Sequence, residues 1–385
     1  MDLIATSSFG LEAVVSRELE ALGYGEQQTE DGRVFFQGDE RAICRTNLWL
    51  RSADRVTICL GRFPAQDFGE LFDQTRELPW ADWLPKDAAF PVRGKSVRSQ
   101  LHSVPDCQAI VKKAIVSAMQ DRYHLERFPE TGAVYSVEVA MLKDMATITL
   151  DTTGAGLHKR GYRTWIGAAP LKETLAAALV QLSYWNPNRH LWDPCCGSGT
   201  IPIEAALIGR NMAPGMNRDF AAESWPRLPA KLWKDVRHEA RELIRPRGTG
   251  EILGTDQDAD IIAKARRHAQ QAGVADNIVF EHRAFEKSKP RYPYGVMITN
   301  PPYGERMGDD ETVEQLYRRM GDMFNAEETW SWYVLSGSPR FEQLANRTAT
   351  RRRKLYNGRI ECTYYQFAGP RPPRPATDTP QDQRS

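Results

Sequence analysis

The pattern of apolar and polar residues changes once along this chain. Over about the first 155 positions, short segments with helical spacing are mixed with short segments that suit strands. Residues 11–22 place apolar side chains on one face at helical spacing, and residues 33–37 form a short apolar strand. Residues 133–151 alternate apolar and polar side chains about Lys143 and Asp144, which is typical of a β-hairpin. The opening of the chain is therefore predicted to be α+β.

A longer helix is predicted from Pro105 onward, because proline is favoured in the first turn of a helix. Its apolar face is expected to carry Ile110, Ala114 and Ala118. Two lysines at 112–113 lie near the opposite, solvated face. This helix belongs to the second of two small α+β units.

From about Lys172 onward, short apolar segments alternate with longer segments of helical periodicity. The segments expected to be strands are 190–194, 251–256, 277–282, 295–299 and 331–337, and those expected to be helices are 200–209, 258–273 and 311–324. This alternation predicts a mostly parallel sheet with helices on both faces. A final antiparallel hairpin is expected around Asn357 and Gly358, which suit a type I′ turn.

Length and charge narrow the class of protein. At 385 residues the chain exceeds what one hydrophobic core usually organises, so we expect about two or three domains. The formal net charge is +1, and a basic surface for a polyanion would therefore have to be local.

Cysteine usage and the N-terminus bear on the compartment. The six cysteines form no C-x-x-C pair and no cluster at zinc-ligand spacing, so we expect reduced thiols and no metal. The N-terminus lacks a signal-peptide pattern, and no apolar run approaches the roughly 18 residues that cross a bilayer. These features predict a soluble cytoplasmic protein without a membrane partner.

A glycine-rich turn follows the first strand of the second pattern, in the sequence LWDPCCGSGT. Gly197 and Gly199 allow the backbone to approach a ligand, and the following helix offers free N–H groups. The third glycine of a dinucleotide fingerprint is replaced by Pro202, and no phosphate-binding G-x-x-x-x-G-K loop is present. A pyrophosphate or nucleoside triphosphate is therefore disfavoured.

Two acids stand at consecutive strand ends. Asp193 precedes the glycine-rich turn, and Asp256 ends the next strand, where an acid often accepts both hydroxyls of a ribose. Either acid alone would suit a helix cap. Together with the glycines they favour a ligand that carries adenosine.

The sequence NPPY follows another apolar strand. The carbonyl of Asn300 and a proline backbone carbonyl can accept both N–H bonds of an exocyclic amine, which restores and aims the nitrogen lone pair. Pro301 and Pro302 limit the backbone, and Tyr303 offers a flat face for a base. We expect Asn300, Pro301 and Tyr303 to form an amine-methylation site.

Basic residues are the candidates for RNA contacts. They are Arg93, Lys95, Arg98, Lys112 and Lys113 in the second α+β unit, Lys159, Arg160 and Arg163 after it, and Arg306 beyond the NPPY tetrapeptide, residues 300–303. Such residues near a helix end suit phosphates, but a solvated face would look similar. The residues alone leave RNA binding open.

The glycine-rich turn and the two acids resemble the S-adenosylmethionine signature of class I methyltransferases. On this resemblance S-adenosylmethionine would be held by Asp193, Cys196, Gly197, Gly199, Thr200 and Asp256. The chain departs from the plainest members, because more than sixty residues separate the two acids. The inserted segment 210–233 is expected to cover the cofactor or contact the substrate.

The first 155 residues resemble a THUMP RNA-binding domain preceded by a ferredoxin-like subdomain, and the whole of residues 1–369 resembles the THUMP-linked RNA methylase family. The resemblance implies methylation of a guanine 2-amino group in 23S ribosomal RNA. Transfer RNA is the alternative substrate, and a non-catalytic factor for ribosome assembly is the alternative of another class. The oligomeric state stays open.

These expectations together give an α/β protein in which an N-terminal α+β region precedes a Rossmann-like methyltransferase domain with a terminal β-hairpin. The expected divisions are a ferredoxin-like subdomain at 1–54, a THUMP domain at 55–155, a linker at 156–171, the methyltransferase domain at 172–369 and a disordered tail at 370–385.

Overall fold

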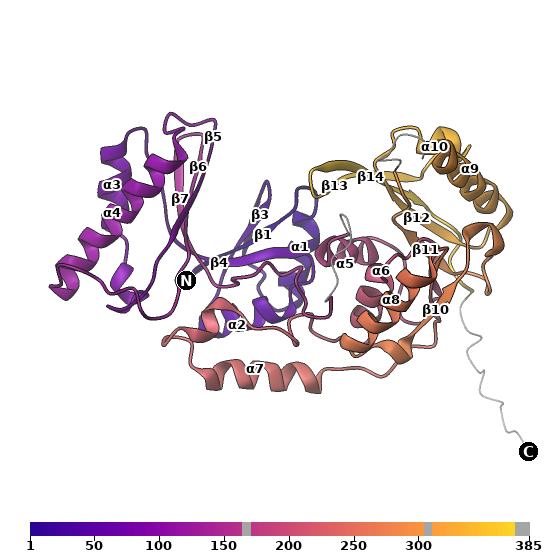
Figure 1. Ribbon diagram of the computed structural model, residues 1–385, viewed down its shortest axis with the longest axis horizontal. Helices are drawn as coiled ribbons and strands as arrows, with labels where there is room; N and C mark the ends of the chain where they lie inside the picture. Colours follow the sequence, from indigo (N-terminus) through magenta and orange to yellow (C-terminus); the bar gives the residue numbers. More distant parts are fainter. Residues whose placement is uncertain (164–170, 304–309, 374–385) are drawn as a thin grey trace, which may run out of the picture.

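The computed structural model describes residues 1–163, 171–303 and 310–373. Within these residues the chain forms two seven-stranded sheets. One sheet belongs to the N-terminal region, residues 1–155, and the other to the C-terminal domain, residues 172–369, which lies beside it (Figure 1). The predicted α/β class is confirmed.

The N-terminal sheet has the strand order β2-β3-β1-β4-β7-β6-β5. Its strands are β1 (Asp2–Ser7), β2 (Gln27–Glu30), β3 (Arg33–Gln37), β4 (Ala53–Pro64), β5 (Val92–Val97), β6 (Val137–Leu142) and β7 (Met145–Asp151). Strand β4 is 12 residues long and pairs with β1 on one side and with β7 on the other. The two expected α+β units therefore share one continuous sheet.

The helices of this region are α1 (Glu12–Ala21), α2 (Glu40–Trp49), α3 (Phe68–Arg76) and α4 (Val104–Tyr123), with a short 3-10 helix at Trp80–Asp82. Helices α3 and α4 lie on one face of strands β5 to β7 (Figure 1). The hairpin predicted about Lys143 and Asp144 is confirmed, and both residues have positive φ.

The apolar face predicted for α4 was placed about one residue out of register. Of the three residues expected there, only Ala114 is fully buried, and the buried face is centred on Val111 and Ile115. Ile110 and Ala118 are partly buried at its margin. Several faces of this helix carry apolar residues, so sequence periodicity gives its orientation only approximately.

The C-terminal sheet has the order β10-β9-β8-β11-β12-β14-β13. Its strands are β8 (Leu191–Asp193), β9 (Ile252–Asp256), β10 (Ile278–His282), β11 (Val296–Thr299), β12 (Ser331–Ser336), β13 (Arg351–Asn357) and β14 (Ile360–Phe367). Strands β8 to β12 are parallel, and β14 and β13 add antiparallel pairs at one end. Each of the five segments predicted as a strand is a strand.

Helices cover both faces of this sheet (Figure 1). They are α5 (Glu173–Gln181), α6 (Thr200–Gly209), α8 (Ala259–Gln271), α9 (Asp310–Ala326) and α10 (Phe341–Leu344), with 3-10 helices at Ala275–Asn277 and Phe285–Lys287. Helix α7 (Ala230–Glu242) and the 3-10 helix Ala221–Ser224 pack instead against the N-terminal region, where α7 lies beside α2 (Figure 1). Throughout the described ranges, no helix is both long and apolar enough to cross a membrane.

The terminal hairpin is present, but its turn was predicted one residue too early. Asn357 is the last residue of β13 and pairs with Ile360, so the loop residues are Gly358 and Arg359. Only Gly358 of these two has positive φ, at 64°. A type I′ turn needs positive φ at both central residues, so the type I′ prediction was wrong.

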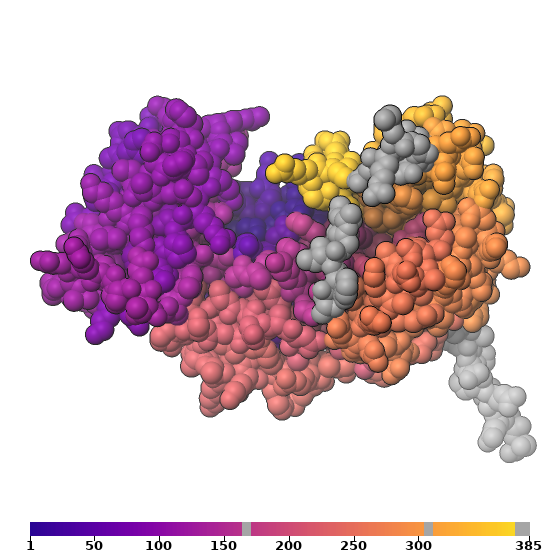
Figure 2. All heavy atoms as spheres, viewed as in Figure 1, coloured from indigo at the N-terminus to yellow at the C-terminus, as the bar shows by residue number. Residues whose placement is uncertain are grey.

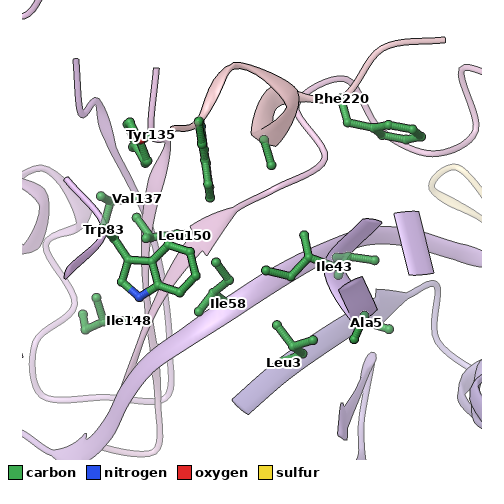
Figure 3. Close-up of a cluster of buried hydrophobic side chains, with 14 of the residues drawn as sticks. Leu3, Ala5, Ile43, Ile58, Trp83, Tyr135, Val137, Ile148, Leu150 and Phe220 are labelled. Carbon is green, nitrogen blue, oxygen red and sulfur yellow. The ribbon is translucent and has the colours of Figure 1, made fainter. Parts of the chain in front are cut away.

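The inserted segment does not take the position expected of it. Phe220, Trp225 and Trp233 are buried in the hydrophobic core of the N-terminal region, and Figure 3 shows Phe220 in the same cluster as Leu3 and Tyr135. The backbone N–H of the segment at Ala222 donates to the Thr152 carbonyl at 3.0 Å. The segment therefore fastens the C-terminal domain to the N-terminal region.

The N-terminal region likewise contributes side chains to the core of the C-terminal domain. Leu11 and Val14, at the start of α1, are buried in the core of the C-terminal domain. The side chain of Gln181 in α5 donates to the carboxylate of Glu18 at 2.6 Å. Because each part contributes to the core of the other, the two are held in one fixed arrangement.

Candidate functional site

The glycine-rich turn, residues 194–199, begins directly after β8 and leads into α6. Gly197 and Gly199 have φ values of 50° and 86°. A Cβ on Gly199 would lie 2.9 Å from the Phe280 ring, whereas a Cβ on Gly197 would meet no atom within 4 Å. Packing therefore requires a glycine at Gly199, whereas Gly197 borders open space that a ligand can occupy.

Asp193 is buried, with 1% of its surface exposed. Its carboxylate accepts hydrogen bonds from the Thr299 hydroxyl at 2.7 Å and from the Cys195 N–H at 3.2 Å. Burial raises the pKa of this carboxyl to about 7, and the charge of Asp256 acts in the same direction. The bond to Thr299 ties the glycine-rich turn to strand β11.

Asp256 ends β9 and is half-buried. One carboxylate oxygen accepts the N–H of Gly197 at 2.9 Å, and the other accepts the N–H of Asp258 at 3.1 Å. The side chain thus lies against the glycine-rich turn, as expected for two acids at neighbouring carboxyl ends of a parallel sheet.

The other two residues predicted to hold the cofactor are more enclosed. Thr200 begins α6 and is buried, and its hydroxyl accepts a hydrogen bond from Arg163. Cys196 is buried, and burial together with the nearby charges of Asp193 and Asp256 raises the pKa of its thiol. The same causes raise the pKa of Cys195, so neither thiol is poised as a thiolate nucleophile.

Residues 300–303 follow β11 at the same edge of the sheet. The Tyr303 hydroxyl donates to the Asn300 side-chain carbonyl. The ring packs against the core of the C-terminal domain, and burial raises the pKa of its hydroxyl. The ring is only partly buried, so stacking of a base on Tyr303 stays a prediction, and its hydroxyl orients the Asn300 carboxamide.

The two proline carbonyls differ in their partners. The Pro302 carbonyl accepts the Tyr317 hydroxyl at 2.8 Å, and that hydroxyl also lies 3.0 Å from Ser336 Oγ. Among the described residues no donor reaches the Pro301 carbonyl. Pro301 thus keeps an acceptor beside that of Asn300.

Thr299 and Tyr317 are the site residues that sequence reasoning missed. Thr299 is a buried polar residue at the end of an apolar strand, immediately before residues 300–303, and that position was a usable signal. Tyr317 lies on the buried face of α9, where it reads as an ordinary core residue.

Some of the predicted basic residues gather in one place. Arg93 and Lys95 lie on exposed positions of β5, and Arg98 follows that strand, exposed and with positive φ. Gly94 packs against α4, so the alternating Arg93 and Lys95 point to the opposite face of the sheet. There they line a cavity of about 260 Å³.

Arg33 and Arg55 line the same cavity and were not predicted. They come from β3 and β4, far from β5 in sequence, so only the shared sheet brings them together. Lys95 pairs with Glu138 at 2.8 Å, whereas Arg93 pairs with no carboxylate in the described part of the chain. The cavity is polar and carries both signs of charge.

Lys112 and Lys113 are separate from this cavity, on α4. The ammonium group of Lys112 donates to Glu130 at 2.6 Å and to the Phe90 carbonyl at 3.2 Å. Lys113 is exposed and lies 5.7 Å from the centre of the Phe72 ring. These two lysines therefore face away from the sheet surface that Arg93 and Lys95 occupy.

The linker residues require a correction. Lys159 is exposed, but Arg160 is only 3% exposed and pairs with the buried Glu204 at 3.4 Å. Arg163 is largely buried and pairs with Glu173 at 3.3 Å. Neither arginine is placed to contact RNA, because each neutralises a buried carboxylate. Arg306 lies outside the described residues.

Histidine, cysteine and acidic side chains in the described ranges form no group of three or more that could hold a metal ion. All six cysteines are free thiols, as predicted. The sheet edge that carries Asp193, Asp256 and Asn300 is thus built from acids, a carboxamide and backbone groups.

Comparison with known proteins agrees with this geometry. Residues 160–366 match the family model described as RMKL-like, methyltransferase domain. Residues 2–57 match an RlmL ferredoxin-like domain, and residues 65–151 match a THUMP domain.

Three known proteins match nearly the whole length of this chain. YpsC of Bacillus subtilis (strain 168), provisionally named an RNA methyltransferase, is 48% identical over 379 residues, 98% of each chain. A crystal structure from Listeria monocytogenes str. 4b F2365, named as a predicted N6-adenine-specific DNA methylase, is 52% identical with a TM-score of 0.91 over 96% of each chain. SMU.472, crystallised in complex with SAH, is 45% identical with a TM-score of 0.91 over 97% of this chain and 99% of its own. This chain belongs to the RMKL-like methyltransferase family, UPF0020.

Proposed function

We propose that this protein uses S-adenosylmethionine to methylate the exocyclic N2 amine of a guanine in RNA, with 23S ribosomal RNA as the favoured substrate. The observation that carries the proposal is the 2.7 Å bond from Thr299 to Asp193. It joins the glycine-rich turn to the strand that presents Asn300, so a methyl donor and an amine acceptor would meet at one edge of the sheet.

The residues at the turn fit S-adenosylmethionine. Gly197 borders open space, Asp193 offers a carboxylate beside it, and Asp256 has carboxylate oxygens suited to ribose hydroxyls. Bound there, S-adenosylmethionine supplies an electrophilic methyl group on sulfur. A relative of 45% identity was crystallised with SAH, the product of such a transfer.

The tetrapeptide supplies acceptors for the amine. A carboxamide oxygen has two lone pairs, so Asn300 can keep the bond from Tyr303 and also accept one N–H of the guanine amine. The Pro301 carbonyl accepts the other N–H. These bonds direct the nitrogen lone pair at the methyl carbon; the new N–C bond forms as the C–S bond breaks, and the methylated amine loses a proton to solvent.

Recognition of RNA rests on the N-terminal region. It matches a THUMP domain, and Arg93, which pairs with no carboxylate among the described residues, lines the cavity of this region and offers a guanidinium group for a phosphate. A relative of 48% identity is provisionally named an RNA methyltransferase. DNA methylation, which the name of the Listeria relative suggests, would leave this region without a role. Transfer RNA is the second substrate candidate.

Asn300→Ala tests the catalytic assignment. The variant should lose most methyl transfer, roughly a hundredfold or more, while its affinities for S-adenosylmethionine and for RNA stay close to those of the wild type. Thr363→Ala, on the neighbouring strand β14, is a matched control with no expected effect. A fully active Asn300→Ala protein would contradict the assignment and favour a non-catalytic RNA-binding factor.

A further inference from the structure

The basic run at residues 351–354, in strand β13, is divided between the two faces of the C-terminal hairpin. Side chains alternate along a strand, so Arg352 and Lys354 share one face. Arg352 pairs there with Glu342 at 2.6 Å. Lys354 pairs with Glu361 at 2.7 Å. Both cations of this face are therefore neutralised by carboxylates of the same domain.

Arg351 and Arg353 lie on the other face of the hairpin. Neither arginine pairs with a carboxylate in the described part of the chain. Arg353 Nε is buried and has no hydrogen-bond partner among the described residues. Gln366, which lies opposite Arg351 on β14, likewise has a buried Nε2 without a partner in that part of the chain. This face therefore carries two positive charges and donors that lack an acceptor.

A third arginine reaches this face from the N-terminal region. Gly10, in the loop before α1, lies so close to β13 that a Cβ on it would be 2.7 Å from the Lys354 carbonyl oxygen. Val14 of α1 is buried in the core of the C-terminal domain together with Leu355 of β13. Arg17 follows Val14 by three residues, so it lies on nearly the same side of α1. Helix α1 thus presents Arg17 to β13.

The three guanidinium groups are close enough to act on one another. Burial lowers the pKa of Arg353, and the like charges of Arg351 and Arg17 lower it further. Arg17 is exposed, and its Nε donates to the Ala13 carbonyl at 3.3 Å. Like charges at close range repel, and an anion bound among them would offset the repulsion. We call Arg17, Arg351 and Arg353 the arginine face.

The arginine face continues along β13 toward the candidate site. Leu355 and Asn357 follow Arg353 at alternate positions, and Asn357 lies about 13 Å from Arg353 at the usual rise of a strand. Burial raises the pKa of the Tyr303 hydroxyl, and a hydrogen bond from the Asn357 side chain opposes that shift. The same hydroxyl donates to Asn300. The end of the hairpin projects into the hollow between the N-terminal region and the C-terminal domain (Figure 2).

We propose that the arginine face binds backbone phosphates of the substrate RNA, a few nucleotides from the target guanine. This inference rests on the proposed function. Guanidinium contacts to phosphates fix the position of a nucleic acid without reading its sequence. Helix α1 and strand β13 supply these contacts jointly, so the RNA is held where the two parts of the molecule meet, beside Asn300.

The test measures the binding of 23S ribosomal RNA, taken from cells that lack the gene, over a range of salt concentrations. It compares the wild type with the double variant Arg17→Gln, Arg353→Gln. The double variant should raise the Kd for RNA roughly tenfold. The slope of log Kd against log salt should fall by about 1.5, because two phosphate contacts are lost. The KM for S-adenosylmethionine should not change.

Two further variants separate a local contact from other causes. Arg352→Gln, Lys354→Gln removes the same charge from the opposite face of β13, and its Kd and salt slope should stay close to those of the wild type. Arg353→Lys keeps the positive charge, so it should keep the wild-type salt slope.

Three results would overturn the inference. The first is an unchanged Kd and slope in the double variant Arg17→Gln, Arg353→Gln. The second is an equal loss of binding in the control Arg352→Gln, Lys354→Gln, which would indicate a general effect of charge. The third is weaker binding with an unchanged slope and a lower Tm, which would indicate a structural role.

Failure of the proposed function would look different. A wild-type protein that binds the RNA without forming N2-methylguanosine would contradict the proposed reaction. In that case the Kd values and salt slopes of the variants still decide whether the arginine face binds RNA.

Discussion

At the scale of single residues, Asp193 is the side chain most changed by its surroundings. An aspartate normally has a pKa near 3.8, but burial raises the pKa of Asp193 to about 7. Its hydrogen bonds from Thr299 and Cys195 act in the opposite direction and do not overcome the burial. Among the described residues no cation pairs with Asp193. A buried carboxylate in such surroundings is costly and is typical of a functional site.

The cost of burying the Asp193 carboxylate should make the stability of the folded protein depend on pH. Between pH 4 and 7 the folded protein retains a proton on Asp193 that the unfolded chain has lost, so the stability contributed by this group falls as pH rises through that window. Asp193→Asn should therefore raise the Tm of the ligand-free protein by a few degrees at pH 8 and leave it nearly unchanged at pH 4. A lower Tm for the variant at pH 8 would contradict the account.

Affinity for S-adenosylmethionine should change in the opposite direction. The ionised form of Asp193 is the one expected to attract the positively charged cofactor, so the Kd of the wild type should rise as pH falls below about 7. Asp193→Asn should bind more weakly and lose this pH dependence. Calorimetric titrations at pH 6, 7 and 8 measure both effects, and a wild-type Kd that is flat across this range would argue against the role of Asp193.

At the scale of elements, the linker is joined to α6 by buried charges. Arg160 is paired with Glu204, which is fully buried and also accepts the Tyr162 hydroxyl at 3.1 Å. Arg163, on the same segment, donates to Thr200 at the end of the glycine-rich turn. The linker therefore supports the turn through two arginines that the sequence alone presented as surface charge.

Removing one member of this buried pair should be costly. Arg160→Met leaves the Glu204 carboxylate without its cation, so we expect a loss of about 3–5 kcal/mol in the free energy of unfolding. The double variant Arg160→Met, Glu204→Met should recover part of that loss, because the buried carboxylate is removed together with its cation, although the buried Arg51 then keeps only the charge of Glu18. Urea denaturation gives the free energy of unfolding of the wild type and of both variants. A single variant as stable as the wild type would show that the ion pair contributes little.

Elements were predictable where the controlling contacts are local. The strands from β8 to β12 and the turn at Lys143 follow from short-range periodicity and turn chemistry, and they are confirmed. The inserted segment was misplaced because its partners, such as Thr152 and Val134, are distant in sequence. The burial of Arg160 has the same cause, since its partner Glu204 is 44 residues away.

Part of the candidate site was likewise predictable from the sequence, and part of it was not. The glycine-rich turn, Asp193, Asp256 and Asn300 are brought to one sheet edge by the parallel order of their strands, which the sequence pattern predicts. The orientation of Tyr303 depends on the hairpin around Cys362 and on Gly337. Such contacts are set by tertiary packing, which periodicity does not specify.

At the scale of the whole molecule, the two parts are interlocked and not merely linked. Phe220 and Trp225 enter the core of the N-terminal region, and Leu11 enters the core of the C-terminal domain. The open face of the N-terminal sheet borders a hollow whose other side carries the C-terminal hairpin (Figure 2). A rigid module at a fixed distance from Asn300 suits selection of one nucleotide in a structured RNA.

We propose that the protein methylates guanine N2 in 23S ribosomal RNA, and nucleoside mass spectrometry of cellular RNA is the decisive measurement. RNA from cells with and without the gene would be separated into 23S, 16S and transfer RNA before digestion. The account predicts that N2-methylguanosine decreases in the 23S fraction alone. A decrease confined to transfer RNA, or no change in any fraction, would contradict it.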